Sequence, residues 1–193
     1  IPATPAGLPA ITGAIAAGIN VNVTLIFSIE NYLAVAEAYV QGLEQRLEAG
    51  GDVSKIASVA SFFISRIDAA VEKILSDNSP LKGKAAIASA RLAYQEFKGI
   101  FYGERFLKLR EAGAHVQRPL WASTSTKNPT YPDTLYLDTL IGAETVNTVP
   151  PNTLVAFKDH GKAESATILD DVDDAKKTFE QLPAAGVNLA QVT

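Results

Sequence analysis

The sequence predicts an α/β fold built on a parallel sheet, and among such folds it favours a (β/α)8 barrel. Strand-like and helix-like segments alternate along the 193 residues, and no linker or low-complexity tract divides them. The strand-like segments are apolar almost throughout, which is typical of parallel strands that helices cover on both faces. Polar residues gather at or just after the ends of several strands, as they do in a barrel.

Four segments have the length and the β-branched, apolar composition of strands. Residues 19–28 follow Gly18, which is suited to end a helix, and residues 58–65 form the second segment. Residues 115–123 and the shorter segment 144–149 are the third and the fourth. We expect these strands to be parallel neighbours in this order.

Helical segments lie between and after these strands. Residues 30–51 have apolar residues at helical spacing, acidic residues early and a Gly-Gly pair at the end. The same spacing predicts further helices over residues 67–77, 84–101, 103–113, 133–142, 151–161 and 171–186. Strands that alternate with helices of this length are typical of βαβ units.

The polar strand ends distinguish a barrel from a doubly wound sheet. A doubly wound sheet concentrates its site at one switch point, whereas a barrel collects its site from many strand ends. No Gly-rich phosphate fingerprint follows any strand of this sequence. Four or five strand–helix units are too few to close a barrel, so we expect part of one. The polar residues are Asn22, Thr24, Ser61, Arg66, Ser123 to Lys127, and Asn147.

Composition narrows the classes of function. The 47% of hydrophobic residues fills one sizeable core, and the apolar runs end well before the roughly 20 residues that span a bilayer. No signal pattern opens the chain, so we expect a cytoplasmic protein. A net charge of −4 without a basic stripe argues against nucleic acid. With no Cys and two His, the sequence offers no disulfide or evident metal site, and we expect no cofactor.

Two cationic residues follow two different strands of this acidic chain. Arg66 follows the second strand, and Lys127 follows the third, within the hydroxyl-rich run WASTSTKNPTYPD. A planar guanidinium and a compact ammonium suit a small dianion such as a sugar phosphate. The alternative is that Arg66 caps or pairs with a neighbouring helix and that Lys127 is a solvated surface residue.

Asn22 and Thr24 point to the same face of the first strand, because side chains alternate along a strand. In a barrel interior, this amide and this hydroxyl are able to hold a substrate hydroxyl and a water. The alternative is a polar pair that is hydrogen-bonded within the barrel. Phe62 and Phe63 are adjacent, so one of them must face away from the other.

Five stretches carry a family pattern, namely IPATPAGLPAI, GINVNVTLIFS, SVASFFISRID, QRPLWASTSTKNPTYPDTLY and TVNTVPPNTLVAFKDHG. In this order they resemble the transaldolases, specifically the bacterial branch that also occurs fused to glucose-6-phosphate isomerase. The resemblance implies a (β/α)8 barrel with class I aldolase chemistry. A lysine amine forms an iminium with a ketose 6-phosphate, and a three-carbon dihydroxyacetone unit then passes to an aldose 4-phosphate in the pentose phosphate pathway. Whether an isomerase domain is fused to the full protein stays open.

The resemblance also implies roles for individual residues of the first two strands. Asn22 and Thr24 match catalytic positions that hold the ketose fragment and a water. Ser61 and Arg66 match contacts to a substrate hydroxyl and to the phosphate, and Phe63 matches a residue that lines the site.

The third strand end shows both matches and departures. Ser123 and Lys127 match substrate-binding positions, where other branches carry an Arg on the phosphate. Ser125 stands where Gly is common in this branch, and Val149 stands where Met is common. On this basis Lys127 is a phosphate anchor and not the covalent nucleophile.

The family's Schiff-base lysine lies immediately before the stretch that begins this chain as IPAT. The resemblance therefore implies that residues 1–193 are roughly the second half of one barrel, the C-terminal part, with both ends truncated. The proton-transfer Glu and Asp of the family also come from earlier strands. We expect the isolated chain to be inactive.

Two alternatives stand beside this interpretation. In the first, the chain is a catalytically inactive half-barrel that binds sugar phosphates through Arg66 and Lys127. In the second, it is a class I aldolase in which Lys127 forms the imine. The position of Lys127 in a loop argues against the second alternative, because an imine-forming lysine needs a desolvated site.

Overall fold

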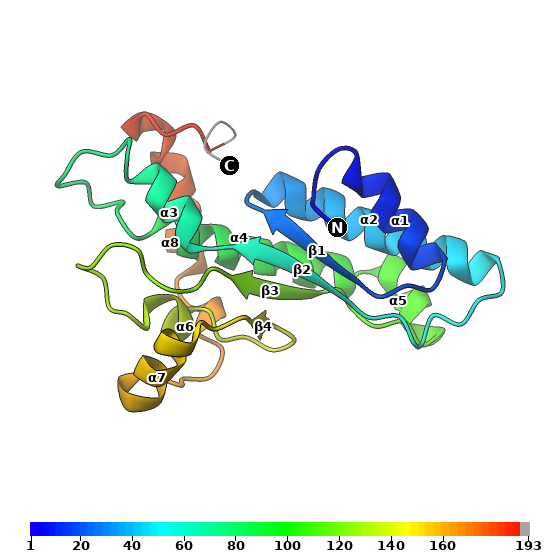
Figure 1. Cartoon of the computed structure of the whole chain (residues 1–193). Coiled ribbons are helices and arrows are strands. Elements are labelled where there is room, and N and C mark those ends of the chain that lie inside the picture. The colour runs from blue at the N-terminus through cyan, green and yellow to red at the C-terminus, as the bar shows by residue number, and fades with distance from the viewer. Residues whose placement is uncertain (190–193) are drawn as a thin grey trace. The chain divides into compact units, whose positions relative to one another are not determined.

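A computed structural model describes residues 1–189 and shows the predicted α/β fold (Figure 1). Its sheet has the strand order β1-β2-β3-β4, which is the order of the strands along the chain. β1 and β2 pair in parallel, as predicted. The bounds are Val21–Ile26 for β1, Ser58–Phe63 for β2, Arg118–Ala122 for β3 and Val146–Asn147 for β4.

Helices alternate with these strands, and all of them except α1 overlap the segments that the sequence predicts. They are α1 (Gly7–Ala16), α2 (Ile29–Glu48), α3 (Ser65–Val71), α4 (Ala85–Phe101), α5 (Glu104–Glu111), α6 (Leu135–Thr139), α7 (Pro151–His160) and α8 (Val172–Gln181), with 3-10 turns at Thr167–Leu169 and Pro183–Ala185. The helix predicted over residues 67–77 is shorter, because the chain turns after Val71 and Ile74 N–H bonds the Val71 carbonyl. None of the helices within residues 1–189 combines the length and the apolarity that crossing a membrane requires.

The chain packs into two compact units. The first unit comprises residues 1–62 and 95–120, and the second comprises residues 63–94 and the chain from Trp121 onward. The second half of α4 therefore belongs to the first unit, and its first half belongs to the second.

In the first unit, α1 and α2 lie against β1 (Figure 1). Val21, Val23 and Ile26 of β1 are buried. Ser28 caps α2 by accepting a hydrogen bond of 3.1 Å from the Asn31 N–H, so the helix begins directly after the strand. The strand thus presents its apolar side chains to the helices.

A bulge in β1 decides which of its side chains face the helices. Val23 pairs with Ala60 and Ile26 pairs with Phe62, so β1 has one extra residue in this interval. The backbone of Leu25 takes up the irregularity with a positive φ of 62°. Because of the extra residue, Ile26 returns to the core while Thr24 stays off it.

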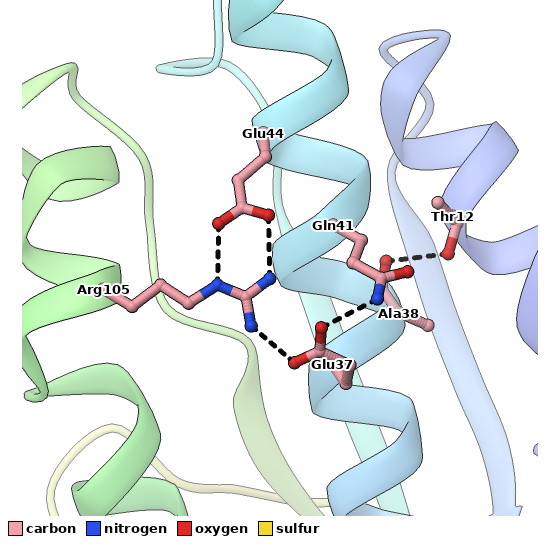
Figure 2. A network of polar contacts seen from close by, with 6 residues as sticks. All are labelled: Thr12, Glu37, Ala38, Gln41, Glu44 and Arg105. Carbon is pink, nitrogen blue, oxygen red and sulfur yellow. Dashed lines mark hydrogen bonds and ion pairs between the residues drawn. The ribbon is translucent and has the colours of Figure 1, made fainter.

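Polar contacts hold α2 from two sides (Figure 2). From α5, Arg105 donates to both carboxylate oxygens of Glu44 at 2.7 and 2.8 Å and to Glu37 at 2.7 Å. These bonds lower the pKa of Glu37 and raise that of Arg105. From α1, Thr12 Oγ1 donates to the Ala38 carbonyl at 3.1 Å. The ion pairs of Arg105 with Glu37 and Glu44 are largely exposed to solvent. Each of them therefore contributes little to the free energy of folding.

A glycine permits the close approach of α1 and α2. A Cβ added at Gly42 would lie 2.7 Å from Ile15 Cβ and 2.8 Å from the Thr12 carbonyl oxygen. Gly42→Ala is therefore expected to lower the free energy of unfolding of the full-length protein by about 1–3 kcal/mol. Urea denaturation measures this change.

Gly99 in α4 provides the matched control. A Cβ at Gly99 meets nothing within 4 Å, so Gly99→Ala is expected to raise stability by up to about 1 kcal/mol through helix propensity alone. Equal effects of the two substitutions would show that α1 and α2 do not pack as closely as described.

Candidate functional site

An amide–hydroxyl cluster of Asn22, Thr24 and Ser61 lies in the first unit. Asn22 is exposed and Thr24 is half-buried, on the face of β1 opposite Val23. From β2, the buried Ser61 hydroxyl donates to Asn22 Oδ1 at 2.7 Å. This bond occupies the amide oxygen and directs the Asn22 amide N–H groups away from Ser61. The cluster can therefore donate hydrogen bonds to the hydroxyl or carbonyl oxygen of a ligand.

Residues 1–3 run beside β1 as a short parallel neighbour. Pro2 forms a parallel bridge with Thr24. The Ile1 amine donates to the Asn22 carbonyl at 2.9 Å, and the Thr24 N–H donates to the Ile1 carbonyl at 2.9 Å. Side chains at paired positions of neighbouring strands point to the same face of a sheet. Pro2 and Thr24 therefore share one face.

Phe63 and Arg66 belong to the second unit, at the end of β2 and the start of α3. Phe62 is buried and Phe63 is half-buried, so the two rings differ in orientation as predicted. The exposed Arg66 guanidinium carbon lies 4.8 Å from the centroid of the Phe63 ring. This cation–π contact orients the guanidinium while its N–H edge can still bind an anion.

Ser123 follows β3 and contacts the start of α3. Its backbone is left-handed, with a φ of 57°, and its hydroxyl lies 2.9 Å from that of Ser65. The Ser65 N–H also donates to the Ser123 carbonyl at 3.1 Å. Sequence reasoning missed the buried Ser65, although its place directly before Arg66 could have drawn attention to it.

Lys127 is exposed, and its Nζ donates to Ser125 Oγ at 2.9 Å. It lines a shallow cavity of about 310 Å³ in the second unit. The other lining residues are Ser65, Ala69, Glu72, Lys73, Asn128, Tyr131 and Tyr136. The convergence of Lys127 and Arg66 on one phosphate stays a prediction.

Two acids, Asp68 of α3 and the α3 C-cap residue Glu72, were not among the predicted site residues. Asp68 is 3% exposed and accepts hydrogen bonds from the Tyr136 hydroxyl at 2.7 Å and from the Ala86 N–H at 2.9 Å. Burial raises the pKa of Asp68 to about 6, against the opposing effect of these two bonds. Glu72 accepts hydrogen bonds from the Tyr131 hydroxyl and from Asn128 Nδ2. Their spacing of four places both acids on one side of the helix.

The whole chain, residues 1–193, matches the family model described as Transaldolase/Fructose-6-phosphate aldolase. It is 54% identical to the transaldolase of Mycolicibacterium smegmatis. The alignment of 197 residues covers all of this chain and 53% of that protein. The transaldolase of a Parafrankia species is 52% identical, again over all of this chain and 53% of the relative. Transaldolase 1 of Streptomyces avermitilis is 50% identical over all of this chain and 52% of the relative. The chain thus spans about half the length of these relatives.

Proposed function

Because the chain belongs to the transaldolase/fructose-6-phosphate aldolase family, we propose that the full-length protein transfers a dihydroxyacetone unit between sugar phosphates. The donor is a ketose 6-phosphate and the acceptor is an aldose 4-phosphate, as in the pentose phosphate pathway. The chemistry runs through a lysine imine, and residues 1–193 supply roughly the second half of the barrel.

The observation that carries this proposal is the pairing of residues 1–3 with β1. Since Pro2 is the parallel partner of Thr24, the residue before Ile1 in the full-length protein would be the partner of Asn22. Its side chain would lie on the face that carries Asn22 and Thr24. A Schiff-base lysine at that position would have its amine beside the amide–hydroxyl cluster, which is where the ketose must be held.

The proposed reaction begins when the neutral lysine amine attacks the ketose carbonyl, and loss of water gives an iminium. The C3–C4 bond then breaks, its electrons move to the iminium nitrogen, and the C4 hydroxyl loses its proton as the aldose phosphate leaves. The resulting enamine attacks the aldehyde carbon of the acceptor. Hydrolysis of the new iminium releases the product and restores the amine.

Asn22 and Thr24 act on the bound three-carbon unit. The Asn22 amide, held by Ser61, donates a hydrogen bond to a hydroxyl of the fragment, and the Thr24 hydroxyl holds the water of the hydrolytic step. Ser61 can accept a hydrogen bond from a substrate hydroxyl while it donates to Asn22.

Arg66 and Lys127 bind the phosphate of the sugar. Phe63 supports the Arg66 guanidinium, and Ser123 offers a hydroxyl at the strand end. Lys127 is unsuited to form the imine, because it is exposed whereas the reactive lysine must be desolvated enough to lose its proton.

Acceptor dependence tests this proposal in the full-length protein. With fructose 6-phosphate and erythrose 4-phosphate, we expect a seven-carbon ketose phosphate and glyceraldehyde 3-phosphate. Without the acceptor, little free dihydroxyacetone should appear, because the fragment stays on the lysine. Release of dihydroxyacetone at the same rate with and without acceptor would identify an aldolase, and binding without turnover would identify an inactive sugar-phosphate binder.

A further inference from the structure

We propose that Glu72 is a positioning residue that fixes the loop carrying Lys127 onto α3, the helix that carries Arg66. The inference rests on the proposed phosphate role of these two cations and adds a residue that sets their relative placement. The loop in question covers residues 123–134, between β3 and α6. All of the residues that carry the argument lie within the second unit.

Both carboxylate oxygens of Glu72 bind this loop. Glu72 is the C-cap residue of α3 and is half-buried. Its Oε1 accepts a hydrogen bond from the Tyr131 hydroxyl, and its Oε2 accepts one of 3.2 Å from Asn128 Nδ2. Asn128 directly follows Lys127 in the sequence. The contact therefore fixes the backbone next to the lysine.

Asn128 also forms hydrogen bonds within the loop. Its Oδ1 accepts hydrogen bonds from the Thr130 N–H at 3.0 Å and from the Thr130 hydroxyl at 2.7 Å. This Asx turn uses the amide oxygen of Asn128, while Glu72 holds the amide nitrogen. One side chain thus couples the turn after Lys127 to α3.

A carboxylate at position 72 matches the two groups that donate to it. A hydroxyl and an amide N–H both point at Glu72, and only a carboxylate accepts at both of its ends. Burial, followed by the bond to Glu72, raises the pKa of the Tyr131 hydroxyl. A glutamine at this position keeps one acceptor oxygen, and its N–H group would satisfy Tyr131 only if the Tyr131 hydroxyl turned to accept.

Glu72 holds the loop without forming an ion pair with Lys127. Glu72 and Lys127 line the same cavity, yet in residues 1–189 no carboxylate lies within ion-pair distance of Lys127 Nζ. Loss of the Tyr131 hydroxyl would free one carboxylate oxygen for the lysine and would loosen the loop. Both changes oppose the binding of a phosphate.

The experiment compares Tyr131→Phe and Glu72→Gln in the full-length protein, with fructose 6-phosphate and unphosphorylated fructose as donors. We expect each substitution to raise KM for the phosphorylated donor about five- to tenfold, the scale of one lost hydrogen bond. We expect kcat, and kcat/KM for fructose, to change little. Tyr94→Phe is the matched control, since it removes a buried tyrosine hydroxyl bond to the Ala143 carbonyl in the same unit but away from the loop.

A double-mutant cycle with Lys127→Ala distinguishes positioning from a general structural effect. If Glu72 and Tyr131 act through Lys127, Tyr131→Phe should add nothing once Lys127 is alanine. Additive effects, or an equal loss for fructose and fructose 6-phosphate, would overturn the inference while leaving the proposed function intact. If Lys127→Ala alone leaves KM for fructose 6-phosphate unchanged, the phosphate role of Lys127 fails, and the inference fails with it.

Discussion

Replacement of Arg66 by alanine in the full-length protein is expected to raise KM for fructose 6-phosphate by about 30- to 150-fold. This range corresponds to about 2–3 kcal/mol, the scale of a charge-assisted bidentate contact between a guanidinium and a phosphate. For unphosphorylated fructose the change should be small. Steady-state kinetics with the two donors measures the difference directly.

The surroundings of Arg66 explain why its removal should affect phosphate binding and not the fold. The guanidinium is exposed, stacks on Phe63 and has no ion pair among the residues that the structure describes. Its removal therefore leaves no buried acid without a partner. Arg66→Lys keeps the charge but loses the planar fork, so its effect should be intermediate.

Arg118→Ala is a matched control, because Arg118 is another exposed arginine at a strand of this chain. It should leave KM for both donors near the unaltered values. An equal loss for fructose and fructose 6-phosphate in Arg66→Ala would show that Arg66 supports the fold and does not bind the phosphate.

The sequence predicted the strand order because its signals are local. Apolar runs of strand length alternate with amphipathic helices, and such units lie beside one another in chain order. The predicted strands 19–28 and 58–65 contain β1 and β2, and their outer residues belong to turns and caps, as Ser28 does. The bulge at Leu25 could not be predicted, because it arises from the register with β2.

The roles of Asp68 and Glu72 could not be read from the sequence either. Acids four residues apart on a helix usually form a solvated face. Their partners, Tyr136 and Tyr131, lie 68 and 59 residues further along the chain, so only the fold brings them together. By contrast, Phe63 and Arg66 are only three residues apart in the sequence, so their contact could have been predicted from the local sequence.

For Asn22, the strand pattern predicted the face of the sheet but not the hydrogen-bond partner. Alternation along β1 correctly predicted that Asn22 and Thr24 share a face away from Val23. That Ser61 donates to the Asn22 amide is a property of the β1–β2 register, which no single strand reveals.

Borohydride trapping of the imine tests the central claim most directly. The full-length protein is incubated with fructose 6-phosphate and borohydride, digested, and analysed by mass spectrometry of its peptides. We expect a reduced adduct on a lysine immediately before the sequence IPAT, because that position would be the strand partner of Asn22. Residues 1–193 alone should give no adduct. An adduct on Lys127, or on any other lysine within residues 1–193, would contradict the account.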